Sequence, residues 1–277
     1  MASIQTSTQR IQRSSDKPLT LTEKRRSVEL WRKKDTFEAQ RLFYALFPEA
    51  NATWTGPSIL GGLMEPGQII YSRDLYAKNI EFFTAGLTHR ERCAMFANRT
   101  GKTLGCGGYE TSCHLTGLYP DWWEGRKFKT PVSAWVAGDT YETTRDIIQL
   151  NLLGEITWRA GRKVMDGRGI IPGALLGTPI WRSGVQNVVD TIPVQHDSGG
   201  WSLLGQKSYD QGRKAFQGTG KHVIWFDEEP PMDVYNEALI RTATLNGITM
   251  LTFTPLSGLS EVVLSFLPAD QRPDLEM

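Results

Sequence analysis

The segment FANRTGKT, residues 96–103, is the most informative part of the sequence. Gly101 allows a turn in which backbone N–H groups converge on an anion, Lys102 can reach the β- and γ-phosphates of a nucleotide, and Thr103 can ligate Mg²⁺. A helix that begins here would direct the positive end of its dipole at the same phosphates. We therefore predict a phosphate-binding loop, although Phe96 stands where the first glycine of such loops is usual.

The predicted nucleotide-binding residues of this loop are Ala97, Asn98, Arg99, Thr100, Gly101, Lys102 and Thr103. Asn98 and Thr100 are expected to shape the loop through hydrogen bonds. A guanidinium at Arg99 has two equally supported roles, which are to stabilise charge on the γ-phosphoryl group or to pair with a neighbouring acid.

A second segment, VIWFDEE at residues 223–229, is an apolar run that ends in three acids. This pattern indicates a buried strand that delivers carboxylates at its carboxyl end. Asp227 is predicted to hold Mg²⁺, commonly through water, and Glu228 to act as a general base on an attacking water. The long separation from Lys102 favours two strands of one parallel sheet over a hairpin. A core strand with solvated acids is the alternative.

The segment ITMLTFTP, residues 248–255, predicts the next buried strand, which ends at a Thr-Pro pair. Ligands of open α/β sheets bind beyond the carboxyl ends of the strands. Hydroxyl groups of Thr252 and Thr254 are therefore candidates for sensing a γ-phosphate, although threonine is also an ordinary strand former.

Composition limits the classes of function. The chain has 277 residues, of which 40% are hydrophobic, and a net charge of +1, so contact with nucleic acid requires local basic patches. The three cysteines and four histidines have no metal-site spacing, so we expect a reducing compartment and no structural metal. No apolar run is long enough for a membrane span, and we expect no secretory signal.

The chain is expected to divide into three parts. Residues 1–18, rich in Ser, Thr and Gln, predict a flexible arm. Residues 19–58 predict a helical segment, opened by a capping box at Thr20 and Glu23, with a basic early part and apolar residues at helical spacing. After a Gly/Pro-rich connector, residues 69–277 predict the nucleotide-binding domain.

Strands and helices alternate in the main domain, which predicts an α/β fold with a mostly parallel central sheet flanked by helices. Strands are expected at 93–97 and 132–138, and helices at 74–91 and 143–153.

Residues 154–185 carry Arg159, Arg162, Lys163 and Arg168. They predict a polar loop, either without special function or facing a nucleic acid backbone. The cluster YPDWW at 119–123 favours packing over base stacking.

At this point the sequence resembles a known family, the ATPase part of tailed-bacteriophage large terminase subunits, the motors of viral genome packaging. The stretches that carry the resemblance are NRTGKT (98–103), HLTGLYPDWW (114–123), SYDQGR (208–213), FQGT (216–219), WFDEEPP (225–231) and TFTPL (252–256). They cover roughly residues 70–265 in the expected order. No single stretch is decisive, but the ordered set is fairly specific.

The resemblance implies a P-loop NTPase fold in which the loop and the acidic strand are Walker A and Walker B motifs. It assigns ATP and Mg²⁺ to Lys102 and Thr103, the metal to Asp227 and water activation to Glu228. It makes Arg99 a catalytic arginine and places Thr252 and Thr254 in a coupling motif. It further predicts an adenine-contacting polar residue ahead of the loop, for which Asn79 is the candidate.

The implied function is ATP hydrolysis coupled to translocation of double-stranded DNA into a procapsid. The implied partners are duplex DNA, the small terminase subunit, the portal and procapsid, and further copies in a ring, in the host cytoplasm and without a membrane. A monomer is an expected state of the isolated domain. Arg145, Arg159, Arg162 and Arg241 are candidates for an arginine supplied to a neighbouring subunit.

Two other functions are considered, and one domain of large terminases is expected to be missing. The alternatives are another P-loop motor of helicase type and a nucleotide-gated binding module without significant hydrolysis. Glu228 beside Asp227 argues against the second, because a module that only binds needs no base there. Large terminases also contain a nuclease domain, for which residues after the coupling motif leave no room, so we expect a truncated chain that does not cleave DNA.

Overall fold

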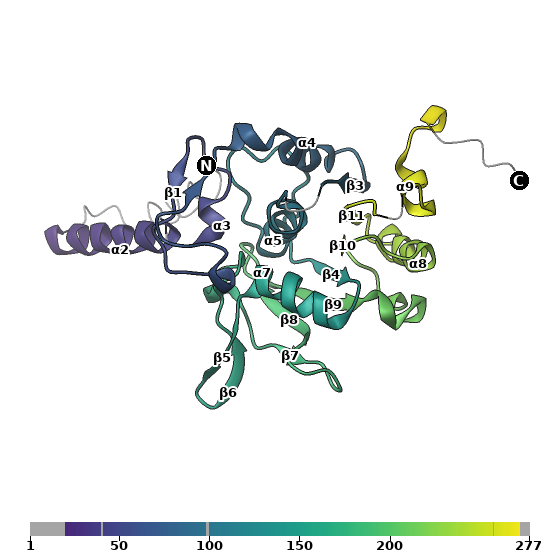
Figure 1. Ribbon diagram of the computed structural model, residues 1–277. Helices are drawn as coiled ribbons and strands as arrows, with labels where there is room; N and C mark the ends of the chain where they lie inside the picture. Colours follow the sequence, from purple (N-terminus) through teal and green to yellow (C-terminus); the bar gives the residue numbers. More distant parts are fainter. Residues whose placement is uncertain (1–19, 40, 98–99, 257, 272–277) are drawn as a thin grey trace, which may run out of the picture.

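The computed structural model describes residues 20–39, 41–97, 100–256 and 258–271, and its main feature is a seven-stranded sheet (Figure 1). The strand order is β3-β11-β10-β4-β9-β8-β7. The first five strands are parallel neighbours, and β8 and β7 pair antiparallel at the other side. The predicted α/β class with a mostly parallel sheet is confirmed.

The strands of this sheet are β3 (Glu91–Met95), β4 (Ser133–Gly138), β7 (Ile180–Trp181), β8 (Val189–Gln195), β9 (Trp201–Ser208), β10 (Val223–Asp227) and β11 (Ile248–Phe253). Two small antiparallel pairs lie outside it, β1 (Ala52–Thr53) with β2 (Ile69–Ile70) and β5 (Ile156–Arg159) with β6 (Arg162–Met165).

The helices and π-helical turns are α2 (Leu21–Ala39), α3 (Leu42–Ala45), α4 (Ala77–Ala85), η3 (Lys102–Gly108), α5 (Tyr109–Thr116), α6 (Tyr141–Thr143), η4 (Thr144–Gln149), α7 (Leu150–Leu153), α8 (Met232–Ala243) and α9 (Glu261–Phe266). Short 3₁₀ turns, such as Arg73–Tyr76 ahead of α4, join several of them.

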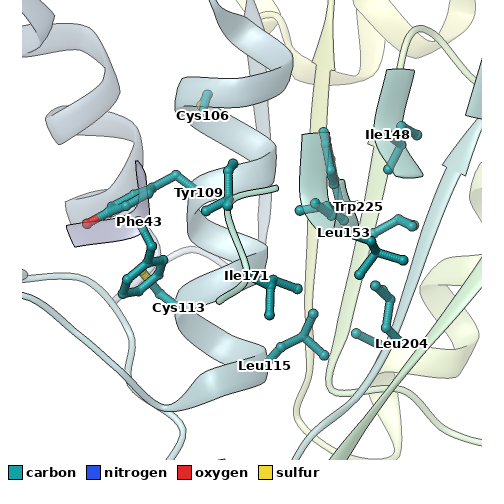
Figure 2. Packing of buried hydrophobic residues seen from close by; sticks show 14 of the residues in the cluster. Phe43, Cys106, Tyr109, Cys113, Leu115, Ile148, Leu153, Ile171, Leu204 and Trp225 are labelled. Carbon is teal, nitrogen blue, oxygen red and sulfur yellow. The ribbon is translucent and has the colours of Figure 1, made fainter. Parts of the chain in front are cut away.

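Both faces of the sheet are covered, and β10 shows why its sequence is apolar throughout. Val223 and Trp225 belong to one buried cluster, and Ile224 and Phe226 to a second. Figure 2 shows the first cluster, in which Trp225 faces residues of α5 and α7. Side chains alternate between the two faces of a strand, so a strand buried on both faces reads as a continuous hydrophobic run.

The beginning of the described chain agrees with the predicted capping box. Glu23 N donates to Thr20 Oγ1 at 3.3 Å, and Thr20 N donates to Glu23 Oε2 at 2.8 Å. The predicted flexible arm, residues 1–18, lies outside the described residues. The helical segment also contains β1, which the sequence did not indicate, and Val28 is exposed whereas Phe43 and Phe47 are buried.

Two local predictions need correction. The helix expected over 74–91 is shorter, because a 3₁₀ turn precedes α4 and β3 already begins at Glu91. The region 154–185, predicted as a loop, contains the hairpin β5–β6. Its turn residues Ala160 and Gly161 both have positive φ, 49° and 74°, as a two-residue hairpin turn requires.

The tryptophan pair before β4 is part of the core, as the sequence favoured. Trp123 is buried and stacks on Phe83 with ring centroids 4.8 Å apart, and Trp122 stacks on Tyr109 at 6.2 Å.

Of the helices within the described ranges, none combines the length and the apolar character that crossing a membrane takes.

Candidate functional site

Thr100 and Gly101, between β3 and the next helix, form a turn that leads directly into that helix. Gly101 has φ 78°, a left-handed conformation that favours glycine, and Gly105 N donates to Gly101 O at 2.7 Å. Thr100 Oγ1 donates to Ala97 O at 2.8 Å. The expected helix is present, although its first part is the π-helical η3, which continues into α5.

A buried ion pair fixes this helix to the strand that precedes the turn. Arg92 of β3 donates to Glu110 of α5 at 2.7 and 3.0 Å, and His114 Nε2 lies 3.1 Å from Glu110 Oε1. Burial raises the pKa of Glu110, but Arg92 and His114 together lower it below its ordinary value. Strand and helix are therefore held in one geometry on both sides of the turn.

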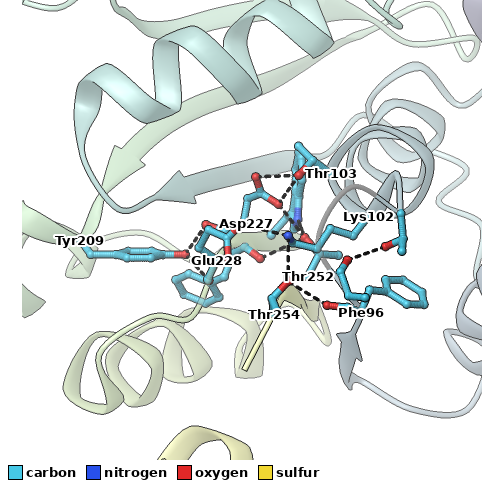
Figure 3. A network of polar contacts seen from close by, with 12 residues as sticks. Phe96, Lys102, Thr103, Tyr209, Asp227, Glu228, Thr252 and Thr254 are labelled. Carbon is cyan, nitrogen blue, oxygen red and sulfur yellow. Dashed lines mark hydrogen bonds and ion pairs between the residues drawn. The ribbon is translucent and has the colours of Figure 1, made fainter. Parts of the chain in front are cut away.

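Thr103 and Asp227 meet although they are 124 positions apart (Figure 3). Thr103 Oγ1 lies 3.0 and 3.1 Å from the two oxygens of the Asp227 carboxylate. Asp227 is the last residue of β10, and its neighbour in β11 is Thr252, which donates to Asp227 Oδ1 at 2.9 Å. Two hydroxyl groups from different elements thus orient one carboxylate.

Burial dominates the electrostatics of Asp227. The residue is 3% exposed, and burial raises the pKa of its carboxyl group to about 7, against the opposing hydrogen bonds from Thr252 and Thr103. That value includes smaller contributions from Glu228, which raises the pKa, and from Lys102, which lowers it. The carboxylate therefore stands in an environment that favours a nearby positive charge.

Lys102 connects the turn with both neighbouring strand ends. Its Nζ lies 3.2 Å from Glu228 Oε1 and donates to Thr254 Oγ1 at 3.2 Å. Thr254 Oγ1 in turn donates to Phe96 O at 2.8 Å, which joins the end of β11 to the beginning of the turn. The ammonium thus lies within reach of the predicted general base and of the predicted coupling threonine.

Glu228 has an unusual backbone. Its φ is 70°, a left-handed conformation that is rare outside glycine, asparagine and aspartate. Its N–H donates to Thr252 O at 3.0 Å, and the Tyr209 hydroxyl lies 2.8 Å from Glu228 O and 3.0 Å from Asp227 O. These contacts hold the strained residue and direct its half-exposed side chain toward Lys102.

A cavity of about 450 Å³ adjoins the turn. Its lining residues are Leu46, Phe47, Ile70, Tyr71, Tyr76, Asn79, Thr100, Gly101, Leu104 and Gly105. Asn79 is buried and its Nδ2 donates to Gly105 O at 2.9 Å. The cavity therefore combines aromatic walls with one side-chain amide beside the helix that follows the turn.

Comparison with known proteins identifies the family. Residues 93–275 match the family model "Terminase large subunit, T4likevirus-type, N-terminal". The chain belongs to the terminase large subunit family. The terminase large subunit of Salmonella phage P22 is 37% identical over 216 residues, which are 72% of this chain and 42% of that protein. The chain thus spans less than half the length of this relative.

A solved structure of a large terminase is also similar. It comes from a thermophilic bacteriophage and is in complex with ADP, at 12% identity and a TM-score of 0.39, covering 64% of this chain and 37% of that one.

The structure of this terminase chain brings together most of the residues singled out from its sequence. Lys102, Thr103, Asp227, Glu228 and Thr254 form one network, and Thr252 supports it from within the core. Ala97, Thr100 and Gly101 lie in the turn, and Asn79 lies at the adjoining cavity. Asn98 and Arg99 lie outside the described residues, so their roles stay predictions.

Sequence reasoning missed several contributors to the site. Tyr209 supports the backbone of Asp227 and Glu228, and Phe47, from the N-terminal segment, lines the cavity. Tyr209 stands in a stretch that carried the family resemblance, which is the one signal that pointed to it. Nothing local in the sequence near Phe47 indicates that it lies at the same cavity as Gly101.

The donor set at the end of β10 fits Mg²⁺. Thr103 and Asp227 supply a hydroxyl and carboxylate oxygens at one point, and hard oxygen ligands are those that this ion prefers. The raised pKa of the buried Asp227 indicates that a cation beside it would relieve an unfavourable charge.

Proposed function

We propose that this chain binds ATP with Mg²⁺ in a P-loop NTPase site and hydrolyses it to drive viral genome packaging. The observation that carries the proposal is the network joining Lys102 and Thr103 to Asp227, Glu228 and Thr254 (Figure 3). A loop with anion-binding geometry, an oxygen donor set and a carboxylate beside them are the parts that phosphoryl transfer to water requires.

The triphosphate would lie at the turn, where Gly101 and the first N–H groups of η3 favour an anion. Lys102 donates to Thr254 and pairs with Glu228, and a γ-phosphate is a stronger acceptor than either. Phosphate binding would therefore draw the ammonium away from Glu228 and leave its carboxylate to accept a proton from water.

Thr103 and Asp227 would hold Mg²⁺, which when bound neutralises charge on the phosphate oxygens. Asp227 would stay ionised beside the cation, because an adjacent positive charge favours the charged form. Arg99 is proposed to stabilise the charge that develops on the transferred phosphoryl group.

The cavity beside the turn is the proposed adenine site. Its walls from Phe47, Tyr71 and Tyr76 offer apolar and aromatic surface to a flat base, and Asn79 offers a side-chain amide. Gly101 and Gly105 line the same cavity, so a base bound there would have its phosphates directed toward the turn.

Thr252 and Thr254 are proposed to couple hydrolysis to movement. Thr254 joins Lys102 to the backbone of Phe96, so a change at the γ-phosphate would alter contacts at the end of β11. By analogy with other members of the family, the movement would translocate double-stranded DNA into a procapsid. A ring of subunits at the portal, together with the small terminase subunit and in the host cytoplasm, is part of this proposal.

The test is ATP turnover and ATP binding, each measured on three variants. Lys102→Ala is expected to lose both, and Glu228→Gln to retain binding but lose about 10²–10⁴-fold in turnover, the usual contribution of a general base. Glu229→Gln is the matched control, because Glu229 accepts a hydrogen bond from Ser260 rather than facing Lys102, and it should hydrolyse ATP normally.

Three outcomes would contradict the proposal. Turnover that survives both Lys102→Ala and Glu228→Gln would show that the site is elsewhere. A wild-type chain that binds ATP but never hydrolyses it would favour a nucleotide-gated binding module. Unwinding of a tailed duplex would favour a helicase-type motor.

A further inference from the structure

The hairpin β5–β6 is an exposed basic element outside the central sheet, and Figure 1 shows it projecting from the body of the molecule. Its six central residues, 158–163, contain three cations and no acid. Trp158 is 69% exposed, an unusual position for so large an apolar side chain. The exposed Trp158 ring is unfavourable in contact with water, which makes the hairpin a candidate contact surface.

Two cations of the hairpin lie opposite each other although like charges repel. Arg159 and Arg162 pair directly across the two strands, and like charges in opposed positions destabilise a hairpin. Within the described ranges, neither forms an ion pair with a carboxylate; Arg159 donates to the backbone carbonyl of Asp166 instead. Lys163 anchors the hairpin, because its Nζ lies 4.1 Å from the Trp181 ring centroid and donates to Asn187.

A small polar cavity lies at the base of the hairpin and is lined by three arginines. It has a volume of about 220 Å³ and is bordered by Arg41, Arg159 and Arg168, with Asp166 as its acid. Both oxygens of the Asp166 carboxylate are engaged, Oδ1 by the N–H groups of Glu155 and Arg168, and Oδ2 by the Arg168 guanidinium at 3.6 Å. The cavity therefore gathers three guanidinium groups and one acid at the base of the hairpin.

We propose that the hairpin β5–β6 and this arginine cavity form a binding surface for the phosphodiester backbone of duplex DNA. The inference rests on the proposed packaging function and names the part of the chain that holds the DNA. Phosphate groups would relieve the repulsion between Arg159 and Arg162, and phosphate contacts need no particular base sequence.

The shape of the element favours DNA over a protein partner. A two-stranded antiparallel ribbon fits the major groove of B-form DNA, and the cations line both the ribbon and the cavity at its base. Protein interfaces also use Trp and Arg, but they pair cations with acids and bury an apolar centre, whereas residues 158–163 include a single large apolar side chain.

The hairpin is also linked to the nucleotide site through one continuous helical segment. β4 ends beside β10 at the site edge of the sheet, and the helical residues from Tyr141 to Leu153 lead from that end to the beginning of the hairpin. The end of β4 and the proposed DNA-binding surface are thus joined by one run of helical residues.

The experiment is fluorescence anisotropy of a labelled 30-base-pair duplex of arbitrary sequence, titrated with the wild-type chain and its variants at several salt concentrations. Basal ATP turnover is measured on the same preparations. The double variant R159E/R162E is expected to weaken binding at least about tenfold and to reduce the slope of log K against log salt by about 2, one for each phosphate that is no longer neutralised. The double variant K129E/K214E, which reverses the same number of exposed charges elsewhere, should bind nearly as the wild type does.

A second variant keeps the test valid if charge reversal disturbs the hairpin. R159K/R162K preserves the charges and should retain most of the binding and the salt slope. Duplex binding equal to that of the wild type in R159E/R162E, or no duplex binding by the wild type at low salt, would overturn the inference. Normal DNA binding by a variant that fails to bind portal protein would instead identify a protein-docking surface, and also overturns it.

Turnover separates this inference from the proposed function. R159E/R162E should bind ATP as the wild type does, because neither residue lines the cavity beside Gly101. Loss of basal turnover with DNA binding intact would identify these residues as arginines supplied to a neighbouring site and contradict the DNA assignment. Absence of turnover in the wild type would contradict the proposed function, whatever the DNA titration gives.

Discussion

The end of β10 and the hairpin β5–β6 both carry charged groups in unfavourable places, but the two regions tolerate them in different ways. At β10, the Asp227 carboxylate is buried and is held by the hydroxyl groups of Thr103 and Thr252. In the hairpin, Arg159 and Arg162 face each other in solvent, with little packing around them.

This difference matches the kind of contact that each region is proposed to make. Burial fixes the position of Asp227 and makes its charge unfavourable, which suits the proposed site for a metal and a water molecule. Exposure leaves the hairpin charges solvated and adaptable, which suits contact with a uniform, repetitive backbone. Mutations should therefore alter stability and chemistry together at β10, but only affinity at the hairpin.

The largest effect is expected for Asp227→Asn. ATP turnover should fall by at least about a hundredfold, because a neutral amide is a poor ligand for Mg²⁺. The nucleotide-free protein should nevertheless become more stable at pH 8, because the variant no longer buries a carboxylate. Steady-state kinetics and thermal unfolding would measure the two effects.

The same variant has an expected pH dependence. The pKa of Asp227 is about 7 in the folded chain and 3.8 without the fold, so its protonated form is favoured by folding. Its stabilising contribution is complete below pH 4 and is lost as the pH rises through 7, a change on the order of 4 kcal/mol. The wild type should lose stability relative to Asp227→Asn over this range. If the difference in their free energies of unfolding is the same at pH 4 and pH 8, the assignment is refuted.

A smaller effect is expected for Thr103→Ala. The loss of its hydroxyl removes one oxygen donor and one orienting hydrogen bond to Asp227, so turnover should fall about 10- to 100-fold. Thr103→Ser keeps the hydroxyl and should restore most of the activity, which distinguishes the chemical role from a packing role. Equal turnover in the alanine and serine variants would argue against metal ligation by Thr103.

Tyr209→Phe tests whether the Tyr209 hydroxyl supports the strained backbone of Glu228. The buried Tyr209 hydroxyl lies between backbone carbonyls of Asp227 and Glu228, so its removal should lower the free energy of unfolding by about 1–3 kcal/mol. Turnover should also fall, because Glu228 would lose the constraint on its left-handed backbone. Chemical denaturation and kinetics on one preparation would show both changes; a variant with unchanged stability would contradict the proposed support.

The smallest effect concerns the stability of the hairpin. Arg162→Ala removes one of two like charges that face each other and should leave the free energy of unfolding unchanged or raise it by about 0.2–0.5 kcal/mol. A loss of more than about 1 kcal/mol in denaturant unfolding would show that Arg162 has a structural role, and the contrast with β10 would fail.

The sequence predicted those parts of the molecule that leave a local pattern. The apolar run that ends at Asp227 and the one that ends at Thr254 both predicted buried strands, and the structure places them side by side. The Gly-Lys-Thr triplet predicted a turn followed by a helix, and Gly101 has the expected left-handed backbone.

Other features depend on contacts that no local pattern encodes. The hydroxyl of Tyr209 reaches Glu228 across the fold, and the aromatic wall of Phe47 comes from a segment that precedes the main domain. The hairpin escapes prediction because its turn is Ala160-Gly161, without the Asn-Gly or Asp-Gly signal that usually reveals such turns. Long-range geometry, rather than propensity, decides these elements.

The most direct measurement is a crystal structure of the chain with Mg²⁺ and a non-hydrolysable ATP analogue. We expect the γ-phosphate beside Lys102, the metal at Thr103 and Asp227, Glu228 facing the γ-phosphate, and the base in the cavity beside Asn79. A nucleotide bound away from the turn at Gly101, or a metal without Asp227 in its surroundings, would contradict the assignment of this site.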